Sequence, residues 1–503
     1  MAYEKIKEKL VKSVYAGVPI VYINSFEEQT VDEIIADVMP RLRPRKVYEW
    51  NGGSGFVRFD TKTKFGDQYK PLKDTLDFLV STGDINQCVL VIKDSAFDLE
   101  HDPALVAKIK EVAMRIMKNV FATLVIISPT VYIPKPIEKF TTLLEVDYLE
   151  SDDIKDVVRN YLVSQKISRI DEDFLKELSL SMKGLTKYEI ENLLAFALTG
   201  NKRIGREDLP MIIEQKQQMI KKSGSLELIP LKETMEDIGG LENLKAWLKN
   251  KAYIYKNIPE AQAFGVSLPK GVLIAGVPGC GKSLNAKAAA SLFGVPLLRL
   301  DMGRILGKYL GESEANMRNA IALAEAISPC VLWIDELEKA FAGLNSENSS
   351  EVTVRLLGSI LTWMQEKDGP TFVVATANDI SKLPPELLRK GRFDEIFYVG
   401  LPNEKERKAI FEIHINKRRK QDVQKIDLQK LVKKSEGYSG SDIEGVVKEG
   451  IELAFVNHKK SLSTEDILNA MNDTQPISKT MSDAIDKLKK AYEDKKFKNA
   501  SET

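Results

Sequence analysis

Two segments decide the fold class of this sequence: "GVPGCGKS" at Gly276–Ser283 and "CVLWIDE" at Cys330–Glu336. The first follows an apolar run and precedes the helix-like "LNAKAAASLF", which is the context of a phosphate-binding loop. Its glycines let backbone N–H groups turn toward a phosphate, and Lys282 adds a mobile cation for the β and γ oxygens. The predicted nucleotide-binding residues of this loop are Gly276, Val277, Pro278, Gly279, Cys280, Gly281, Lys282, Ser283 and Leu284.

Two carboxylates end the second segment. Asp335 and Glu336 follow an apolar run, so we expect them at the carboxyl edge of a buried strand, where open α/β sheets bind ligands. Asp335 and the hydroxyl of Ser283 would ligate Mg²⁺, and Glu336 would orient and deprotonate the attacking water. The alternative is an ordinary strand that enters an acidic helix start, which the upstream loop argues against.

Three polar residues further along fit the same chemistry. Asn378 ends the run "FVVATAND" and could hydrogen-bond the γ-phosphate or the water, although a lone Asn after a strand is usually a turn residue. Arg389 and Arg392 in "LLRKGRFD" suit bidentate contact with phosphate, as arginine fingers do. Their alternative is a surface ion pair with a carboxylate such as Asp394.

The order of apolar runs and amphipathic stretches predicts an α/β fold in both halves. Strands are expected at 271–275, 296–300, 331–334, 372–375 and 395–398, and earlier at 19–23, 46–49, 89–92, 124–127 and 144–148. The predicted domains are 1–150, α/β without a phosphate loop; 151–220, a helical lid-like region; 221–233, a linker; 234–403, the large ATPase domain; 404–480, a helical lid; and 481–503, a charged tail.

The two halves look like diverged copies of one unit. "CVLVIKDSAF" from Cys88 aligns with "CVLWIDELEKAF" from Cys330, and "GLTKYEIENL" from Gly184 aligns with "GYSGSDIEGV" from Gly437. In the first copy Lys93 stands where Asp335 should be, and "NSFEEQT" replaces the glycine-rich loop. We therefore expect no nucleotide in the first half; chance likeness of two generic α/β segments is the alternative.

Composition narrows the class of protein. With 503 residues the chain should form more than one domain, and 43% apolar residues can fill their cores. The sequence has 73 basic residues (Lys and Arg) and 73 acidic residues (Asp and Glu). This balance gives no net attraction to nucleic acid or anionic membranes, so neither is favoured as a partner. Three scattered cysteines form no disulfide framework or metal knuckle, and neither a signal peptide nor a long apolar segment is evident. A cytoplasmic protein, or a stromal one if plastid-encoded, is expected.

A family resemblance rests on the phosphate loop and on the segments "DIGGL" at Asp237–Leu241, "GESE", "WIDE", "ATAN" and "LLRKGRFD". Taken together, these segments resemble an AAA+ protein of the meiotic, FtsH-like or "IGGL" group. A closer resemblance rests on four longer segments: "IGGLENLKAWL", "SPCVLWIDELEKAF", "LTWMQEK" and "LPPELLRKGRFDEIF". They resemble the conserved-open-reading-frame AAA proteins of cyanobacteria and red-algal plastids. That family also carries a first half without a phosphate loop and a joint like "KSGSLE", so the likeness covers nearly the whole chain.

This resemblance implies a parallel P-loop sheet with a helical lid, preceded by a degenerate AAA-like module, and a Mg-ATP-hydrolysing enzyme that assembles as a hexamer. In it Arg389 and Arg392 reach the neighbour's nucleotide. Nucleotide contacts beyond the loop fall on Asp237, Ile238, Gly239, Gly440 and Ser441. Ser441 stands where many AAA proteins have Ala, and Cys280 where Thr or Ser is common. A thiol there could make the enzyme oxidisable, or be an inert small side chain.

The segment "GRILGKYLGESE" bears on what the ATP is used for. Its residues Lys308, Tyr309 and Leu310 resemble the pore loop with which AAA unfoldases grip polypeptide, and a buried packing tyrosine is the alternative. Our first hypothesis is a ring-forming remodeller or translocase that acts on an unidentified protein partner. The second is an ATP-controlled regulatory or assembly scaffold without threading, and a DNA-acting ATPase is the third.

Overall fold

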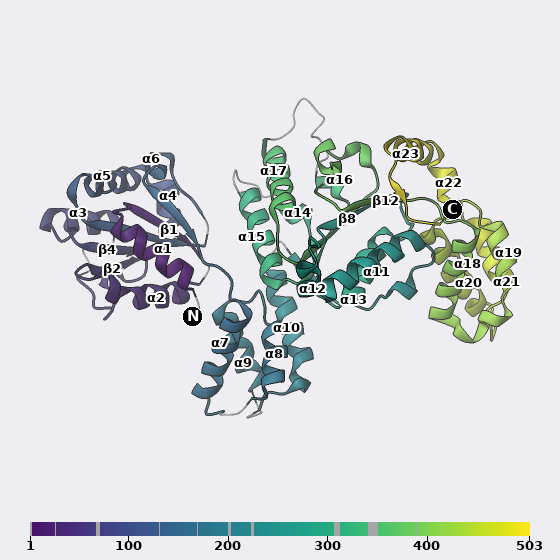
Figure 1. Cartoon of the computed structure of the whole chain (residues 1–503), viewed down its shortest axis with the longest axis horizontal. Coiled ribbons are helices and arrows are strands. Elements are labelled where there is room, and N and C mark those ends of the chain that lie inside the picture. Colours follow the sequence, from purple (N-terminus) through teal and green to yellow (C-terminus); the bar gives the residue numbers. More distant parts are fainter. Residues whose placement is uncertain are drawn as a thin grey trace. The chain divides into compact units, whose positions relative to one another are not determined.

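The structure is a computed structural model of the chain. It describes residues 3–502 except 26, 67–70, 130, 168–169, 200–202, 223–225, 306–311, 341–350 and 390. The chain divides into two compact units, residues 1–213 and 214–503. Each unit holds one sheet with helices around it and a separate group of helices that follows in the sequence (Figure 1).

The first unit is built on a six-stranded sheet in the order β3-β2-β4-β5-β1-β6, in which only β3 runs antiparallel to its neighbour. The strands are β1 (Ile20–Asn24), β2 (Lys46–Asn51), β3 (Gly55–Arg58), β4 (Cys88–Ile92), β5 (Ala122–Ser128) and β6 (Thr141–Glu145). The central strands β4 and β5 are buried along their whole length, as expected of parallel strands covered on both faces.

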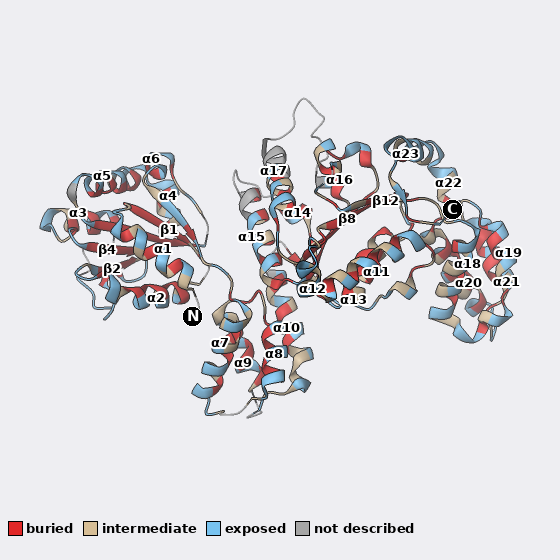
Figure 2. Ribbon diagram, in the orientation of Figure 1, coloured by how far each residue is buried: buried red, intermediate tan, exposed pale blue. Residues whose placement is uncertain are grey.

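Helices cover both faces of this sheet. Apolar residues of α1 (Glu4–Tyr15) and α2 (Glu28–Val38) pack on one face, and those of α3 (Leu72–Thr82) and α5 (Pro103–Asn119) on the other. In Figure 2 the strands and the sheet-facing sides of these helices are red, which marks the core. The remaining helices of the first half are α4 (Ala96–His101), α6 (Lys135–Glu138), α7 (Ser151–Ser164), α8 (Glu172–Ser181), α9 (Lys187–Ala197) and α10 (Leu209–Lys222).

The second unit is built on a seven-stranded sheet in the order β13-β12-β8-β11-β10-β9-β7, in which only β7 is antiparallel. The strands are β7 (Leu226–Ile229), β8 (Gly271–Gly276), β9 (Leu297–Leu300), β10 (Cys330–Ile334), β11 (Thr371–Ala377), β12 (Glu395–Val399) and β13 (Lys498–Asn499). On one face, apolar residues of α11 (Glu242–Lys256) and α13 (Lys282–Phe293) join Trp333 and Phe372 of the sheet in one core.

The other helices of this unit surround the sheet or form the lid. Around the sheet lie α12 (Ile258–Ala263), α14 (Met302–Ile305), α15 (Glu312–Ile327), α16 (Leu337–Ala340) and α17 (Glu351–Glu366). The lid contains α18 (Glu404–Arg419), α19 (Leu428–Lys434), α20 (Gly440–Val456) and α21 (Thr464–Asp473), which share their own core. The chain ends with α22 (Ile477–Thr480) and α23 (Ser482–Lys495) before β13.

The two sheets have the same topology, which supports the predicted repeat. In each, five parallel strands, numbered by their order along the chain, lie side by side as 5-1-4-3-2, and the second sheet adds a sixth parallel strand, β13, beyond β12. An antiparallel edge strand then follows the second of them, β3 in the first sheet and β7 in the other. Because chance likeness of two generic segments would not reproduce this order of five parallel strands, the degenerate AAA-like module expected in the first half is confirmed.

The helical regions repeat a detail of helix capping as well. Gly184 and Gly437 both have φ of +80°. Two residues after each, Thr186 begins α9 and Ser439 begins α20, each with a reciprocal capping box closed by an acidic residue three positions on. The alignment made from the sequence therefore matches equivalent helix starts.

Some predicted elements differ from the structure. The strand expected at 144–148 lies at Thr141–Glu145, an edge strand whose mostly exposed residues give a weak apolar pattern. The edge strands β3, β7 and β13 were not expected. Residues 481–503, predicted as a charged tail, form α23 and β13, and β13 pairs with β12.

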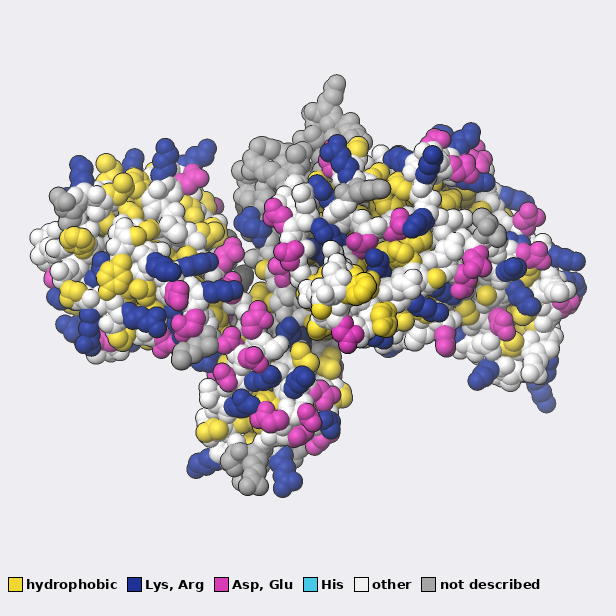
Figure 3. Space-filling view, in the orientation of Figure 1, with side chains coloured by type: hydrophobic (Ala, Val, Ile, Leu, Met, Phe, Trp, Pro, Cys, Tyr) yellow, Lys and Arg dark blue, Asp and Glu magenta, His cyan; other side chains and the backbone are white. Residues whose placement is uncertain are grey.

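Charged side chains of both signs are interspersed over the visible face of the protein, without a broad area of one sign (Figure 3). This distribution agrees with the equal numbers of basic and acidic residues. None of the helices among the described residues combines the length and the apolar character that a membrane crossing requires.

Candidate active site

The predicted phosphate loop joins β8 to α13. Gly276, Gly279 and Gly281 have φ of +146°, +74° and +84°, so each adopts a backbone conformation that other residues rarely reach. A Cβ on Gly276 would also collide with the carbonyl oxygen of Val399. The loop thus needs glycine for its conformation, as expected from the sequence, and at Gly276 also for space.

Lys282 is the first residue of α13 and is 7% exposed. Its Nζ donates to the carbonyl oxygens of Gly276 at 2.9 Å and Val277 at 2.8 Å, so the ammonium is held over the loop. Burial lowers the pKa of Lys282 to about 8, because desolvation disfavours the charged form. Phosphate oxygens bound beside Lys282 would stabilise its positive charge in place of the water that burial excludes.

The two predicted metal ligands lie in contact. The Ser283 hydroxyl donates to Oδ1 of Asp335 at 3.1 Å, and the Thr376 hydroxyl donates to the same oxygen at 2.5 Å. Thr376 also accepts the backbone N–H of Glu336 at 3.0 Å. Thr376 therefore fixes both acidic residues; sequence reasoning missed it because a threonine inside an apolar strand carries no motif signal.

Glu336 is held in a strained conformation, with φ of +49°. Its carboxylate accepts from Nδ2 of Asn378 at 3.2 Å and pairs with Nζ of Lys339 at 2.5 Å. The backbone N–H of Asn378 in turn donates to Glu338, a further acidic residue that the sequence analysis did not single out. The end of β10 and the end of β11 are thus joined through these side chains.

A cavity of about 460 Å³ opens above these residues and extends to the lid. Its wall contains most of the predicted nucleotide contacts, namely Asp237, Ile238, Gly239, Pro278, Gly279, Cys280, Gly281, Lys282, Ser283, Leu284, Asp335, Glu336, Asn378, Gly440 and Ser441. Gly276 and Val277 do not line it, because both are buried at the end of β8. The carboxylate of Asp237 accepts from the backbone N–H of Thr234 at 2.8 Å and caps its own turn.

The lid closes the cavity at its far end. The backbone N–H and the hydroxyl of Ser441 both donate to the carbonyl oxygen of Gly279, at 2.9 and 3.2 Å. Sequence reasoning missed the rest of this wall, since single residues on helices or between elements form no motif. These residues are Glu406, Ile410, Ile413 and His414 of α18, Glu444 of α20, and Leu241, Gly400 and Pro402 outside the helices; Thr376 of β11 completes the wall. Burial lowers the pKa of His414, which favours its neutral form.

Cys280 is 9% exposed, and its thiol lies 3.7 Å from the carbonyl oxygen of Pro278. Burial raises the pKa of Cys280 to about 11. The thiolate is therefore a small fraction at neutral pH, which favours the inert interpretation of this side chain over the oxidisable one.

The two arginines do not line the cavity of their own chain. Arg389 is exposed, and Arg392 is half-buried with an Nε that has no hydrogen-bond partner among the described residues. Asp394, their alternative partner, accepts from the backbone N–H groups of Lys270 at 2.8 Å and Gly271 at 3.1 Å. Asp394 thus has another role, which weakens the surface-pair interpretation.

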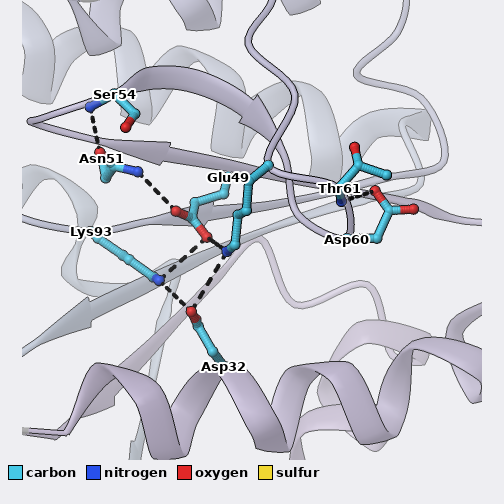
Figure 4. Close-up of polar contacts among 8 residues, drawn as sticks. Asp32, Glu49, Asn51, Ser54, Asp60, Thr61 and Lys93 are labelled. Atoms are coloured by element: carbon cyan, nitrogen blue, oxygen red, sulfur yellow. Dashed lines mark hydrogen bonds and ion pairs between the residues drawn. The ribbon is translucent and has the colours of Figure 1, made fainter.

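In the first unit the equivalent position holds an ion-pair network (Figure 4). Lys93, 5% exposed, stands directly after β4 as Asp335 does after β10, and contacts Asp32 at 2.7 Å and Glu49 at 3.3 Å. Lys62 also pairs with Glu49, at 2.5 Å. Asp94 follows Lys93 with φ of +56°, the same backbone feature as Glu336. The first unit thus has the same backbone turn, and internal ion pairs occupy the position that the predicted metal ligand Asp335 has in the second unit.

The predicted pore-loop residues Lys308, Tyr309 and Leu310 lie outside the described residues.

Comparison with known families agrees with this geometry. Residues 272–401 match the ATPase family associated with various cellular activities (AAA), and residues 425–469 match the AAA+ lid domain. Residues 6–146 and 152–223 match the N-terminal and second domains of SpoVK-like AAA ATPases. The fold, the phosphate loop and the lid thus define the class: the protein is an AAA ATPase, with the nucleotide site in its second unit.

Whole-chain relatives define the family more closely. The chain is 37% identical to the AAA domain-containing protein ycf46 of Guillardia theta over 97% of this chain and 94% of the relative. It is 35% identical to ycf46 of Pyropia yezoensis over 98% of each. The cell division cycle protein 48 homolog of Archaeoglobus fulgidus is 30% identical over 63% of this chain and 42% of that protein. The chain belongs to the ycf46 family of AAA domain-containing proteins, which confirms the resemblance found in the sequence.

Proposed function

We propose that the second unit binds Mg-ATP between its phosphate loop and its lid, and that a ring of such subunits uses the hydrolysis to remodel a protein partner. The observation that carries the proposal is the joined set of Ser283, Asp335, Glu336 and Asn378 beside the buried ammonium of Lys282. These groups supply what phosphoryl transfer requires: charge compensation, metal ligands and a located nucleophile.

The metal-binding residues fit Mg²⁺. The Ser283 hydroxyl and the Asp335 carboxylate are hard oxygen donors in mutual contact, and Thr376 orients the carboxylate. Bound Mg²⁺ supplies charge neutralisation for the phosphate oxygens. Lys282 then binds the β and γ oxygens, while the backbone N–H groups of the glycine loop bind the β-phosphate.

Glu336 acts as the general base. Its carboxylate accepts the proton of the attacking water, and Asn378 orients both the carboxylate and the water through its amide. Lys339 pairs with the second carboxylate oxygen of Glu336 at 2.5 Å. At the far end of the cavity Asp237, Ile238, Gly239, Gly440 and Ser441 surround the nucleoside.

Arg389 and Arg392 act on the nucleotide of a neighbouring subunit. Their absence from the wall of their own cavity and the engagement of Asp394 elsewhere support this assignment. Membership in the AAA family favours a hexameric ring, in which each site is completed by the next subunit.

The work done by the ring is the remodelling of a polypeptide gripped at Tyr309. Similarity to the cell division cycle protein 48 homolog supports a remodeller. The ATP-dependent zinc metalloprotease FtsH of Aster yellows witches'-broom phytoplasma is 32% identical over 48% of this chain, but this sequence contains no His-Glu-x-x-His. The second candidate, a regulatory scaffold, is favoured by the first unit, which keeps an AAA-like fold without phosphate-binding chemistry and could recruit partners.

Partner capture tests the proposal. Glu336→Gln should bind ATP, stall before hydrolysis and retain a protein partner that Lys282→Ala does not retain. With that partner identified, Tyr309→Ala separates the two candidates: loss of remodelling at unchanged basal ATPase supports threading. Unchanged remodelling by a stable Tyr309→Ala protein would leave the scaffold as the function. If Tyr309 is instead buried, its truncation should cost about 3–5 kcal/mol of stability and lower every activity together.

A further inference from the structure

Glu338 is an acidic residue behind the active site to which the proposed mechanism gives no role. It lies in the first turn of α16, two residues after Glu336, and is 6% exposed. Its Oε1 accepts the backbone N–H of Asn378 at 3.0 Å. Its Oε2 is buried and has no hydrogen-bond partner among the described residues. Burial of a carboxylate oxygen without a hydrogen bond costs free energy, so the position of Glu338 needs an explanation.

The contacts of Glu338 complete a closed set of links with Asn378 and the proposed base, Glu336. Glu336 and Glu338 are fixed to one another by the turn that leads from β10 into α16. Glu338 holds the backbone of Asn378, and the side chain of Asn378 donates to Glu336 at 3.2 Å. The amide position of Asn378 therefore depends on Glu338.

We propose that Glu338 is a positioning residue of the ATPase reaction, which fixes the Asn378 amide against the Glu336 carboxylate by accepting the Asn378 backbone N–H. This inference rests on the proposed roles of Glu336 and Asn378. Glu338 touches no reacting atom; its effect is on the geometry of the base and the water. A misplacement of about 1 Å in such a group can cost on the order of a hundredfold in rate.

The hydrogen bond, rather than the charge, is what the position requires. Glu338→Gln keeps an oxygen that can accept the Asn378 N–H, whereas Glu338→Met keeps the length and loses the acceptor. In the full chain, Glu338→Met should lower kcat at least about tenfold and leave the KM for ATP and the affinity for ADP within about twofold. Glu338→Gln should keep kcat within about threefold of the wild type.

Glu406 offers a matched contrast at the other end of the cavity. It is also 6% exposed and accepts two backbone N–H groups: that of Leu241 at 2.9 Å, beside the predicted nucleoside contacts, and that of Asn403 at 2.9 Å, which closes the capping box of α18. Glu406→Met should therefore raise the KM for ATP more than it lowers kcat. Opposite effects of two equally buried glutamates would exclude a general loss of folding as the cause.

A double mutant decides whether Glu338 acts through Asn378. If it does, Glu338→Met added to Asn378→Ala should lower kcat no further than Asn378→Ala alone. Wild-type kcat in Glu338→Met, an inactive Glu338→Gln, or additive losses in the double mutant would each overturn the inference. An inactive Glu336→Gln beside a fully active Glu338→Met would overturn it while the proposed function stands. If melting shows that Glu338→Met does not fold, Glu338→Leu replaces it under the same criteria.

Discussion

At the scale of single residues, the site depends on backbone strain at one position. Glu336 has a positive φ, which is uncommon for a residue with a Cβ, and its N–H is held by the Thr376 hydroxyl. Such strain persists where the surroundings fix it. Asp94 in the first unit also has a positive φ, so the same backbone turn occurs there without the predicted catalytic carboxylates.

Thr376→Val tests this arrangement, because valine has nearly the shape of threonine and lacks its hydroxyl. Both Asp335 and the backbone of Glu336 lose a partner, so kcat should fall at least about tenfold and the Mg²⁺ concentration for half-maximal activity should rise. Steady-state ATPase assays at varied Mg²⁺ check it. Thr371→Val, at the start of the same strand, is the control and should leave both quantities unchanged. A Thr376→Val enzyme with wild-type kinetics would contradict the role given to that hydroxyl.

Cys280 should react slowly with alkylating reagents at neutral pH. Its pKa is raised to about 11, so the thiolate fraction, and with it the rate of modification, should increase about tenfold for each pH unit from 7 toward 10. Iodoacetamide inactivation, followed by ATPase activity with Cys280→Ser as control, measures this rate. Rapid inactivation at pH 7 that the serine variant escapes would mean an activated thiol.

Much of this site could be predicted from sequence because its chemistry is concentrated in short motifs. The glycine loop, Asp335 and Glu336 occupy fixed offsets from apolar strands, and strand order brings them to one edge. Thr376, Glu338 and the lid residues His414 and Glu444 could not be found that way. Their roles depend on which side chains the fold brings together, and this cannot be deduced from the spacing of residues along the sequence.

At the scale of secondary-structure elements, buried strands were predictable and edge strands were not. β4, β5, β8, β10 and β11 are buried along their whole length and read as continuous apolar runs. The edge strands β3, β7 and β13 have four, four and two residues, which is too short for a strand pattern to stand out in the sequence. Nothing in the local sequence of β13 records that it returns to pair with β12.

Lys93 is an element-scale support, since it ties α2 to the ends of β2 and β4. Burial alone would lower the pKa of Lys93, but Asp32 and Glu49 outweigh it and raise that pKa. Lys93→Met would leave Glu49, 3% exposed, with one fewer cation, and breaking such a buried pair costs about 3–5 kcal/mol. Hydrogen exchange should accelerate in peptides from α2 and β2 while basal ATPase is unchanged.

The control for this experiment is Lys155→Met, which breaks the surface pair with Asp152. Exposed ion pairs contribute little, so exchange should match that of the wild type. If Lys93→Met also left exchange in α2 and β2 unchanged, the network would be no support of the first unit.

At the scale of the whole molecule, catalysis should cross subunit boundaries. Arg392→Ala and Lys282→Ala should each be inactive alone. The first lacks the arginine that contacts the nucleotide of the neighbouring subunit, and the second binds no ATP. Mixed rings contain sites with an intact Lys282 beside an intact Arg392, so mixing should restore part of the phosphate release. Absence of rescue despite co-assembly, shown by pull-down of differently tagged subunits, would rule against action in trans.

The central claim is that one nucleotide site per chain, built on Lys282 and Glu336, performs the hydrolysis. Calorimetric titration of the full-length Glu336→Gln protein with Mg-ATP, followed by a phosphate-release assay on the same sample, tests it most directly. The predicted result is one ATP bound per chain without turnover, and no ATP bound by Lys282→Ala. A second ATP per chain, binding by Lys282→Ala, or full turnover by Glu336→Gln would contradict the account.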